Sequence, residues 1–293
     1  MQLKTIGITS PGDMGQGVAH RLKAHGYEVC VALEGRSERT RALAHKAELT
    51  DCGSLAKLVE RCDMIMSILN PAAAVDNARA IAAAMRATGT TPIYVDCNAI
   101  APQTTRDIDT LIRDAGAIFI DAGIIGPPPR GTARARLYVS GPDAPMLNQI
   151  ADDQLLVRVA GTRIGDASAV KMCYASITKG AIALGTELLI AARKLGVEQA
   201  LEEEFRESQA ELYEWILSRS RIMPPKAYRW VPEMNEIAKT FDGVGLTPRI
   251  LQGAADMFEY IADTPLGRET PEQARERRRS GTEVMRALAD GTS

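Results

Sequence analysis

Lys171 lies in a long apolar stretch, and its type and neighbours suggest proton transfer. The stretch runs from Gly165 to Gly196 and repeats apolar residues at steps of three and four, the spacing of an amphipathic helix. Tyr174 and Thr178 follow Lys171 by three and seven residues, so the three side chains project from one helix face. A lysine and a tyrosine placed in this way can exchange protons with a bound substrate, and we expect both to be catalytic. In the alternative, the lysine stem packs while its ammonium reaches solvent, and the tyrosine belongs to the core.

The apolar stripe of this helix predicts which side it turns to the protein interior. Small residues occupy most of the other positions, so a second backbone could approach closely there. We expect Asp166 to cap the first turn and Gly196 to end the helix. The sequence therefore predicts a buried central helix, whose interior stripe consists of Val170, Cys173, Ile177, Ala181, Leu184, Leu188, Ala191 and Leu195.

Length, charge and cysteine content limit the class of protein. The 293 residues suffice for two domains, and a formal net charge of -2 makes nucleic acid an unexpected partner. The five cysteines form no CxxC pair, so we expect small core residues of a reduced, cytoplasmic protein and no metal site. We expect no membrane association, because no long apolar run opens the chain and no later segment is expected to reach the length of a membrane span.

A glycine-rich turn follows the first predicted strand, residues 5–9, and precedes a predicted helix, residues 14–25. A dinucleotide site needs this order, because the pyrophosphate meets bare backbone N–H groups at a helix N-terminus. The GxGxxG pattern has a serine in place of its first glycine, and a structural glycine turn is the alternative interpretation. We expect the nucleotide to contact the five residues Ser10, Gly12, Asp13, Met14 and Gly15.

The tip of the second predicted strand, residues 28–33, bears on the choice of nucleotide. A carboxylate at this position binds the ribose 2'-hydroxyl of NAD, whereas the 2'-phosphate of NADP needs cations and hydroxyls. Arg36 and Ser37 follow the strand and favour NADP as the cofactor over NAD. Two alternatives stay open: Glu34 binds the ribose, or the arginines are the solvated start of a helix.

Strands and helices then alternate, which predicts an α/β fold with a doubly wound parallel sheet. The predicted strands span residues 64–69, 93–96, 117–121 and 137–140, and the helices span 72–85 and 104–114. Ligands of such sheets bind at the carboxyl ends of the strands. Three segments are expected along that edge: 70–71, 96–98 and 123–126.

Everything after Gly196 has helical periodicity, with predicted helices at residues 198–219, 227–241, 248–262 and 271–288. We predict two domains. The first, residues 1–164, binds the dinucleotide, and the second, residues 165–293, is all-helical and begins with the long helix that carries Lys171. Before that helix, three prolines stiffen a loop beside Arg130, Arg134 and Arg136. One of these arginines could clamp a carboxylate or phosphate of the substrate; the alternative is that they are surface charge.

The order of GITSPGDMG, GRS, SILNP, DCNAIAP, DAGIIGPP and GDASAVKMCYA resembles the β-hydroxyacid dehydrogenase family, which includes 3-hydroxyisobutyrate dehydrogenase and is related to 6-phosphogluconate dehydrogenase. The resemblance covers the first two hundred residues, and the later helices are similar to those of a poorly characterised branch. It implies that Lys171 is the general acid/base and that the C-terminal helices form a homodimer. It also places Leu69, Asn70, Pro71 and Asn98 at the cofactor.

Three departures from the family pattern affect substrate binding. Asn98 stands where a serine is usual, Ile125-Gly126-Pro127 replaces an SGG motif, and Ala175 replaces an asparagine. The residues expected to contact substrate are therefore Asn98, Ile125, Gly126, Pro127, Tyr174, Thr178 and Lys179.

The sequence thus predicts an NADP-dependent oxidoreductase that moves a hydride between nicotinamide and a small hydroxy acid or its keto form. The substrate is expected to be a small anion. An imine reductase of the same architecture is one alternative, although the lysine is usually replaced there. A sensor that binds NADP(H) without turnover is the other.

Overall fold

The computed structural model describes residues 2–292 and divides into two compact units. The first spans Met1–Met172 and the second Cys173–Ser293. The division falls inside the long helix α6 (Asp166–Lys194), whereas the predicted domain boundary lies just before that helix. Each unit is described below by itself.

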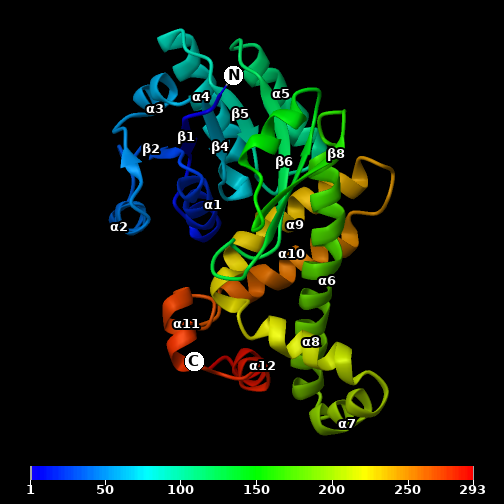
Figure 1. Cartoon of the computed structure of the whole chain (residues 1–293). Helices are drawn as coiled ribbons and strands as arrows, with labels where there is room; N and C mark the ends of the chain where they lie inside the picture. The colour runs from blue at the N-terminus through cyan, green and yellow to red at the C-terminus, as the bar shows by residue number, and fades with distance from the viewer. Residues whose placement is uncertain (1, 293) are drawn as a thin grey trace. The chain divides into compact units, whose positions relative to one another are not determined.

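The first unit contains an eight-stranded sheet with the order β3-β2-β1-β4-β5-β6-β7-β8 (Figure 1). Strands β1 to β6 run parallel, β7 runs antiparallel to β6, and β8 runs parallel to β7. The strand order reverses between β1 and β4, which is where doubly wound sheets bind ligands. The strands are β1 (Thr5–Ile8), β2 (Glu28–Val31), β3 (Thr50–Asp51), β4 (Met64–Ser67), β5 (Ile93–Asp96), β6 (Phe119–Ile125), β7 (Ala135–Ser140) and β8 (Leu155–Gly161).

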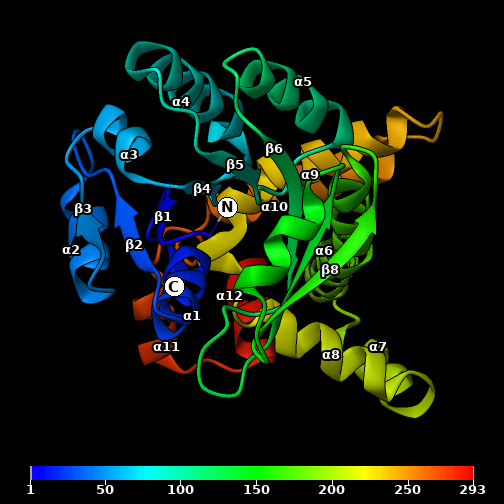
Figure 2. The same ribbon diagram turned by 45° about the horizontal axis from the view of Figure 1, so that its top comes forward.

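Helices cover both faces of this sheet, as the predicted fold class requires. Figure 2 shows α4 and α5 on one side of the strands and α1 on the other. The helices of this unit are α1 (Asp13–Ala24), α2 (Glu38–Lys46), α3 (Leu55–Arg61), η1 (Pro71–Ala73), α4 (Ala74–Thr88), α5 (Pro102–Arg113) and η2 (Ala144–Ile150).

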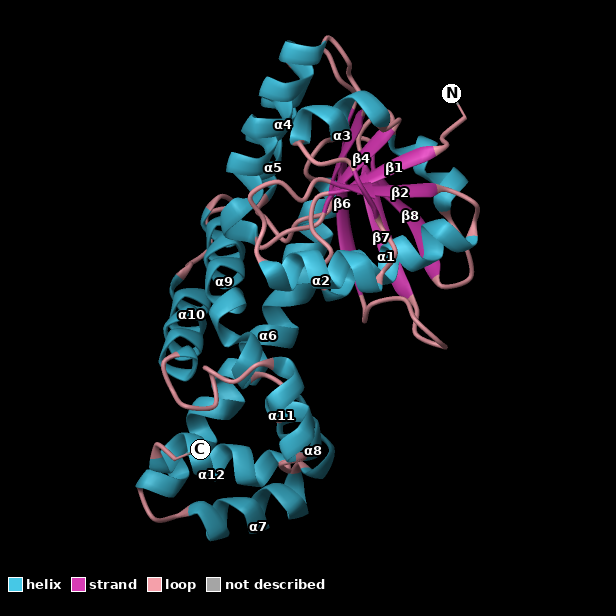
Figure 3. Cartoon of the chain, turned by 90° about the vertical axis from the view of Figure 1, so that its left-hand side faces the viewer, coloured by secondary structure: helices cyan, strands magenta, loops and turns pink. Residues whose placement is uncertain are grey.

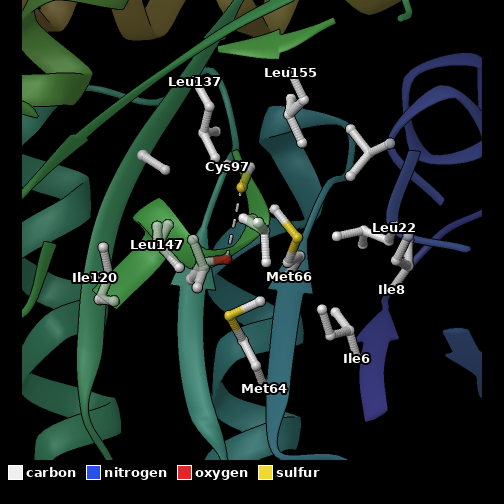
Figure 4. Close-up of a cluster of buried hydrophobic side chains, with 14 of the residues drawn as sticks. Ile6, Ile8, Leu22, Met64, Met66, Cys97, Ile120, Leu137, Leu147 and Leu155 are labelled. Carbon is white, nitrogen blue, oxygen red and sulfur yellow. Dashed lines mark hydrogen bonds between the residues drawn. The ribbon is translucent and has the colours of Figure 1, made fainter. Parts of the chain in front are cut away.

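Two separate apolar layers result, because successive strand residues point to opposite faces. On one face, Ile6, Ile8 and Met66 pack with Leu22 of α1 and Leu147 of η2 (Figure 4). The other face packs against α3, α4 and α5. The β-branched runs that predicted these strands are thus buried on both sides, as parallel strands usually are.

The second unit is entirely helical in the residues that the structure describes (Figure 3). Two of the predicted helices are each divided in two. Gln209 leaves the helical conformation (φ -144°, ψ 38°) between α7 and α8, and Arg278 adopts φ 50° between α11 and α12. The helices are α7 (Glu198–Ser208), α8 (Ala210–Ser220), η3 (Pro224–Lys226), α9 (Ala227–Asp242), α10 (Arg249–Ala262), α11 (Pro271–Arg277) and α12 (Gly281–Asp290).

Five elements of the first unit are absent from the sequence prediction: β3, β8, α2, α3 and η2. β3 has only two residues, and α2 is a short and mostly polar helix. β6 also continues to Ile125, beyond its predicted end at Asp121. Gly123 therefore lies inside a strand and not in a loop.

The predicted interior stripe of α6 was assigned to the wrong side of the helix. Ile177, Leu184 and Leu195 are 68%, 64% and 75% exposed in the single chain. The buried side instead includes Ile182 and the small residues. At Gly185 an added Cβ would lie 2.7 Å from a methyl carbon of Ile216, so the small side chains let α8 approach the helix backbone. The packed side thus combines these small residues with buried Met172, Ile182 and Ile190.

The expectation that no segment reaches the length of a membrane span was also wrong. Helix α6 has 29 residues and a mean hydropathy of 1.3 over its most apolar part. By length and composition alone, it is long and apolar enough to cross a membrane. Core helices of soluble proteins share this length and composition. This helix carries charged residues along its length: Lys171, Lys179 and Glu187.

Candidate active site

The turn between β1 and α1 has the form that a dinucleotide phosphate needs. A Cβ on Gly15 would lie 2.1 Å from the carbonyl oxygen of Ser10, so only glycine fits. A Cβ on Gly12 would meet nothing within 4 Å, which leaves this backbone open to a ligand. Gly12 is the N-cap of α1 and provides no side-chain cap, so the first N–H groups remain available to an anion. The serine in the first glycine position is compatible with this turn.

The three-proline loop packs against the same helix. A Cβ on Gly17 would lie 2.9 Å from Pro128 and from Pro129, which shows how closely the loop and α1 approach. Arg130 donates to the carbonyl oxygen of Asp13 at 2.9 Å and to its carboxylate at 3.2 Å. The guanidinium thus lies at the first turn of α1 and offsets the negative charge of Asp13 there. Met14 packs against the sheet core.

The tip of β2 presents the residues that favour NADP. Gly35 has φ 68°, a conformation that suits glycine, and it leads into Arg36. Ser37 is the N-cap of α2, and its hydroxyl accepts from the backbone N–H of Thr40 at 3.3 Å. Glu34 is exposed, and its backbone N–H donates to the carbonyl oxygen of Gly53. A cation and a hydroxyl therefore follow the strand in adjacent positions.

Asn98 links the carboxyl ends of two neighbouring strands. Its side-chain oxygen accepts from the N–H of Leu69 at 2.7 Å, and its amide donates to the hydroxyl of Ser67 at 2.9 Å. The residue is buried. These bonds fix the loop after β4, where Asn70 caps the short helix that starts at Pro71. The structure thus gives Asn98 a positioning role, and its predicted contact with substrate stays a prediction.

Lys171 lies over β6, at the edge of the sheet that carries the nucleotide turn. A Cβ on Gly123 would lie 2.8 Å from the Cβ of Lys171 and 3.1 Å from the carbonyl oxygen of Ala167. The first turns of α6 therefore pack directly on the strand backbone, and Lys171 is held partly buried there. Glycine at position 123 is what permits this distance.

Asp121 is the residue that sequence reasoning missed. Its carboxylate accepts from the N–H groups of Gly165, Ala167 and Ser168 at 2.9 to 3.2 Å, and from the hydroxyls of Ser168 and Ser140 at 2.6 Å. Burial raises the pKa of Asp121, and these hydrogen bonds partly oppose that rise. Asp121 thus caps α6 from a distant strand, a role that the sequence assigned to Asp166. The sequence signal for Asp121 was its position at the end of the predicted strand 117–121, as Asp96 ends the predicted strand 93–96.

Among the other predicted substrate residues, Ile125 ends β6 and is buried, and Gly126 follows it with φ 121°. An added Cβ at Gly126 would lie 2.8 Å from the carbonyl oxygen of Arg134, so the tight turn into Pro127 requires glycine. The lost serine hydroxyl of the family pattern has no replacement within this turn.

The last three predicted residues lie on α6 within the second unit. Tyr174 is half exposed, and Thr178 donates its hydroxyl hydrogen to the carbonyl oxygen of Tyr174 at 3.2 Å. Lys179 forms an ion pair with Glu233, and its ammonium lies 5.3 Å from the ring centre of Trp230. Both members of the pair are largely buried, so Lys179 is already neutralised inside this unit. Its predicted contact with an anionic substrate would require this pair to separate.

Asp96 gives the first unit a specific pH dependence. Burial raises the pKa of Asp96 from 3.8 to about 7, and one carboxylate oxygen, Oδ2, has no hydrogen-bond partner within residues 2–292. Between pH 3.8 and about pH 7, Asp96 is therefore protonated in the folded protein and ionised in the unfolded chain. Stability from this group is therefore complete below pH 3.8 and falls as the pH rises to about 7.

We expect the Asp96→Asn variant to lose this pH dependence. Across the range, the dependence changes the free energy of unfolding by at most about 4 kcal/mol. Asparagine keeps an oxygen that can accept from the N–H of Asn98, as Asp96 does at 2.9 Å. Urea unfolding measured from about pH 4.5 to about pH 8 tests the expectation. Asp107→Asn, on the exposed side of α5, is the matched control. Parallel curves for wild type and Asp96→Asn would show that Asp96 does not titrate in this range.

Comparison with known proteins agrees with a dinucleotide-binding turn between β1 and α1. A family model described as the NAD binding domain of 6-phosphogluconate dehydrogenase matches residues 5–152, and one described as a domain of unknown function (DUF1932) matches residues 192–261. The protein belongs to the β-hydroxyacid dehydrogenase family. It is an oxidoreductase with an NAD(P)-binding domain, and both the predicted family and the predicted fold class are confirmed.

Two relatives are similar to this chain in sequence over most of its length. The conserved protein MTH1747, a protein of unknown function with structural similarity to 3-hydroxyacid dehydrogenases, is 32% identical, with a TM-score of 0.63 over 88% of this chain and 97% of that one. An uncharacterised 28.5 kDa protein of Methanothermus fervidus is 28% identical over 260 residues, which cover 88% of this chain and 99% of that protein.

More distant structures share the fold alone. The 3-hydroxyisobutyrate dehydrogenase of Mycobacterium tuberculosis, solved with L-serine, is 18% identical, with a TM-score of 0.65 over 95% of this chain and all of that one. An imine reductase of Myxococcus stipitatus, solved with NAD+, is 16% identical, with a TM-score of 0.55 over 98% and 99% of the two chains.

Proposed function

We propose that the protein is a cytoplasmic, NADP-dependent dehydrogenase that oxidises a small anionic hydroxy acid or reduces the corresponding keto acid. The observation that carries the proposal is the packing of Lys171 on Gly123 of β6. This packing brings the Lys171 side chain against the parallel strands, whose carboxyl edge also bears the open turn at Gly12, and so supports the proposal. A proton-transfer group and a dinucleotide turn on one edge are the two parts that hydride transfer requires.

Each group of residues has its own role in the proposed reaction. The uncapped N–H groups at the start of α1 bind the pyrophosphate, and Arg36 with Ser37 bind the 2'-phosphate. When bound, the nicotinamide accepts or supplies the hydride. Lys171 takes the hydroxyl proton at its Nζ during oxidation and returns it during reduction. Tyr174 and Thr178 orient the substrate from the next turns of α6.

A panel assay tests the activity. The purified protein is mixed with NADP+ and a series of small hydroxy acids, and the absorbance of NADPH is followed. Turnover with one acid class supports the proposal. Reduction of cyclic imines by NADPH, without any oxidation of hydroxy acids, would show an imine reductase instead. Tight nucleotide binding with no turnover on either panel would favour a sensor.

Arg36 is expected to decide the cofactor preference. We expect Arg36→Ala to weaken NADPH binding about 10-fold to 100-fold, because a charge-assisted contact to the 2'-phosphate is lost. Binding of NADH should change less than about twofold. Fluorescence titration with each nucleotide measures both constants. Glu34→Gln is the matched variant: if it impairs NADH while Arg36→Ala leaves NADPH unaffected, the enzyme uses NAD.

The exposed side of α6 supports the further proposal of a homodimer. Ile177 and Leu184 are large apolar residues seven positions apart, so they lie on one helix face, and both are mostly exposed. A second copy of the chain would bury this face. We expect Ile177→Asp combined with Leu184→Asp to convert a dimer to a monomer in light scattering after gel filtration. Glu187→Gln, on the same helix, is the control, and a monomeric wild type would refute the proposal.

A further inference from the structure

Three of the five cysteines meet in one place, on the face of the sheet that α3 and α4 cover. Cys30 lies on β2, and Cys62 directly follows α3. Gly7 of β1 is the strand partner of Cys30, and a Cβ on Gly7 would lie 3.1 Å from the sulfur of Cys62. Neighbouring strands are about 4.8 Å apart, so the sulfur of Cys62 lies beside the side chain of Cys30. We therefore infer that small rotations of the Cys30 and Cys62 side chains could bring their sulfurs to the geometry of a disulfide.

Cys52 approaches Cys30 from the other neighbouring strand. Thr50 of β3 is the strand partner of Cys30, and Cys52, two residues later, points to the same face. The N–H of Cys52 still donates to the carbonyl oxygen of Val31 at 2.8 Å, which continues the strand pairing. Cys52 and Cys62 both lie close enough to Cys30 to alter the pKa of its thiol. All three cysteines are free.

These contacts make Cys30 the reactive member of the group. The hydrogen bond from Cys62, and then that from Cys52, lower the pKa of Cys30 to about 7, although burial and Glu28 oppose this. Burial raises the pKa of Cys52 to about 12. Since the thiolate is the nucleophile, Cys30 reacts at neutral pH while its neighbours stay protonated.

The position at the sheet edge provides access. Cys30 is fully buried, but Cys52 is partly exposed next to β3, a two-residue strand at the edge of the sheet. Short edge strands open locally at lower free energy than the core. A peroxide is small enough to enter during such openings.

We propose that Cys30 is a peroxide-reactive thiol that forms a disulfide with one of its two neighbours, Cys52 or Cys62. The Cys30 thiolate attacks one peroxide oxygen, the O–O bond breaks, and the other oxygen leaves as water after taking a proton. The neighbouring thiol then attacks the sulfenic acid, an S–S bond replaces the S–O bond, and a second water leaves. In sum, two thiols are oxidised and one hydrogen peroxide is reduced to two waters. The proposal does not depend on the proposed dehydrogenase activity.

Peptide mapping tests this directly, because trypsin separates the three cysteines. Cys30 falls in residues 24–36, Cys52 in 47–57 and Cys62 in 62–79. The native full-length protein is treated with hydrogen peroxide, its remaining thiols are blocked with N-ethylmaleimide, and the digest is analysed without reduction. We expect residues 24–36 linked to one of the other two peptides, and release of the link by dithiothreitol.

Variants separate this site from general thiol oxidation. Cys97→Ala, at a buried thiol outside the group, should leave the link unchanged. Cys52→Ser alters only a partly exposed side chain and should leave a link between Cys30 and Cys62, while Cys52→Ser with Cys62→Ala should abolish every link to Cys30. Cys30 should be oxidised about tenfold faster than Cys97. The proposal fails if Cys30 stays fully blockable while exposed Cys173 is oxidised, or if the link appears only at peroxide levels that unfold the protein by circular dichroism.

Discussion

Replacing Lys171 with alanine is expected to lower turnover about 1,000-fold, since general acid/base groups contribute roughly 100-fold to 10,000-fold. The NADPH dissociation constant and the thermal midpoint should change little. Lys171 is only partly buried, and the contact of its Cβ with Gly123, which sets the helix position, is kept by alanine. The loss should therefore appear in kcat and not in nucleotide binding.

The measurement is a steady-state comparison on whichever hydroxy acid the wild type oxidises. Lys57→Ala, at an exposed position of α3, is the lysine control and should have wild-type rates. Full activity of Lys171→Ala would remove the lysine from the mechanism and leave Tyr174 as the proton donor to test. Loss of NADPH binding in the same variant would instead indicate damage to the sheet edge, and circular dichroism would distinguish the two results.

Asp121→Asn is expected to destabilise the protein by about 3 to 5 kcal/mol. The carboxylate accepts five hydrogen bonds in a buried site, three of them from N–H groups at the start of α6. An amide of the same shape must direct its NH2 group toward some of these donors. Buried N–H groups then lose their acceptor, and the start of the helix that carries Lys171 loses its cap.

Urea unfolding at neutral pH measures this effect. The comparison is Asp166→Asn, since Asp166 lies at the same helix end but is partly exposed and paired with Arg163 at 3.0 Å. We expect that variant to lose less than about 1 kcal/mol. Equal losses in the two variants would mean that Asp121 is not the main cap of α6. Activity should fall with Asp121→Asn even at temperatures where the variant remains folded, because Lys171 is then less well positioned.

Local patterns in the sequence were sufficient for the central strands and the nucleotide turn of the first unit. Short β-branched runs predicted β1, β4 and β5 within a few residues, because strands buried on both faces must be apolar throughout. The glycines of the turn predicted α1 and its open N-terminus, because Gly15 stands where no side chain fits. Spacing alone put Lys171 on a long helix near residue 166, where α6 begins.

Distant contacts decided the rest. Asp121, not the adjacent Asp166, caps α6, because strand β6 brings a buried carboxylate to the N–H groups from 44 or more positions away. The side of α6 that packs was chosen by how closely α8 could approach Gly185, and a hydrophobic pattern carries no information about that distance. Lys179 was neutralised by Glu233, a residue 54 positions later. The sequence by itself determined the central strands, the nucleotide turn, the long helix and the residue types that could do chemistry. The tertiary structure decided which of these residues have partners, because ion pairs, caps and close backbone contacts join residues that no local period connects.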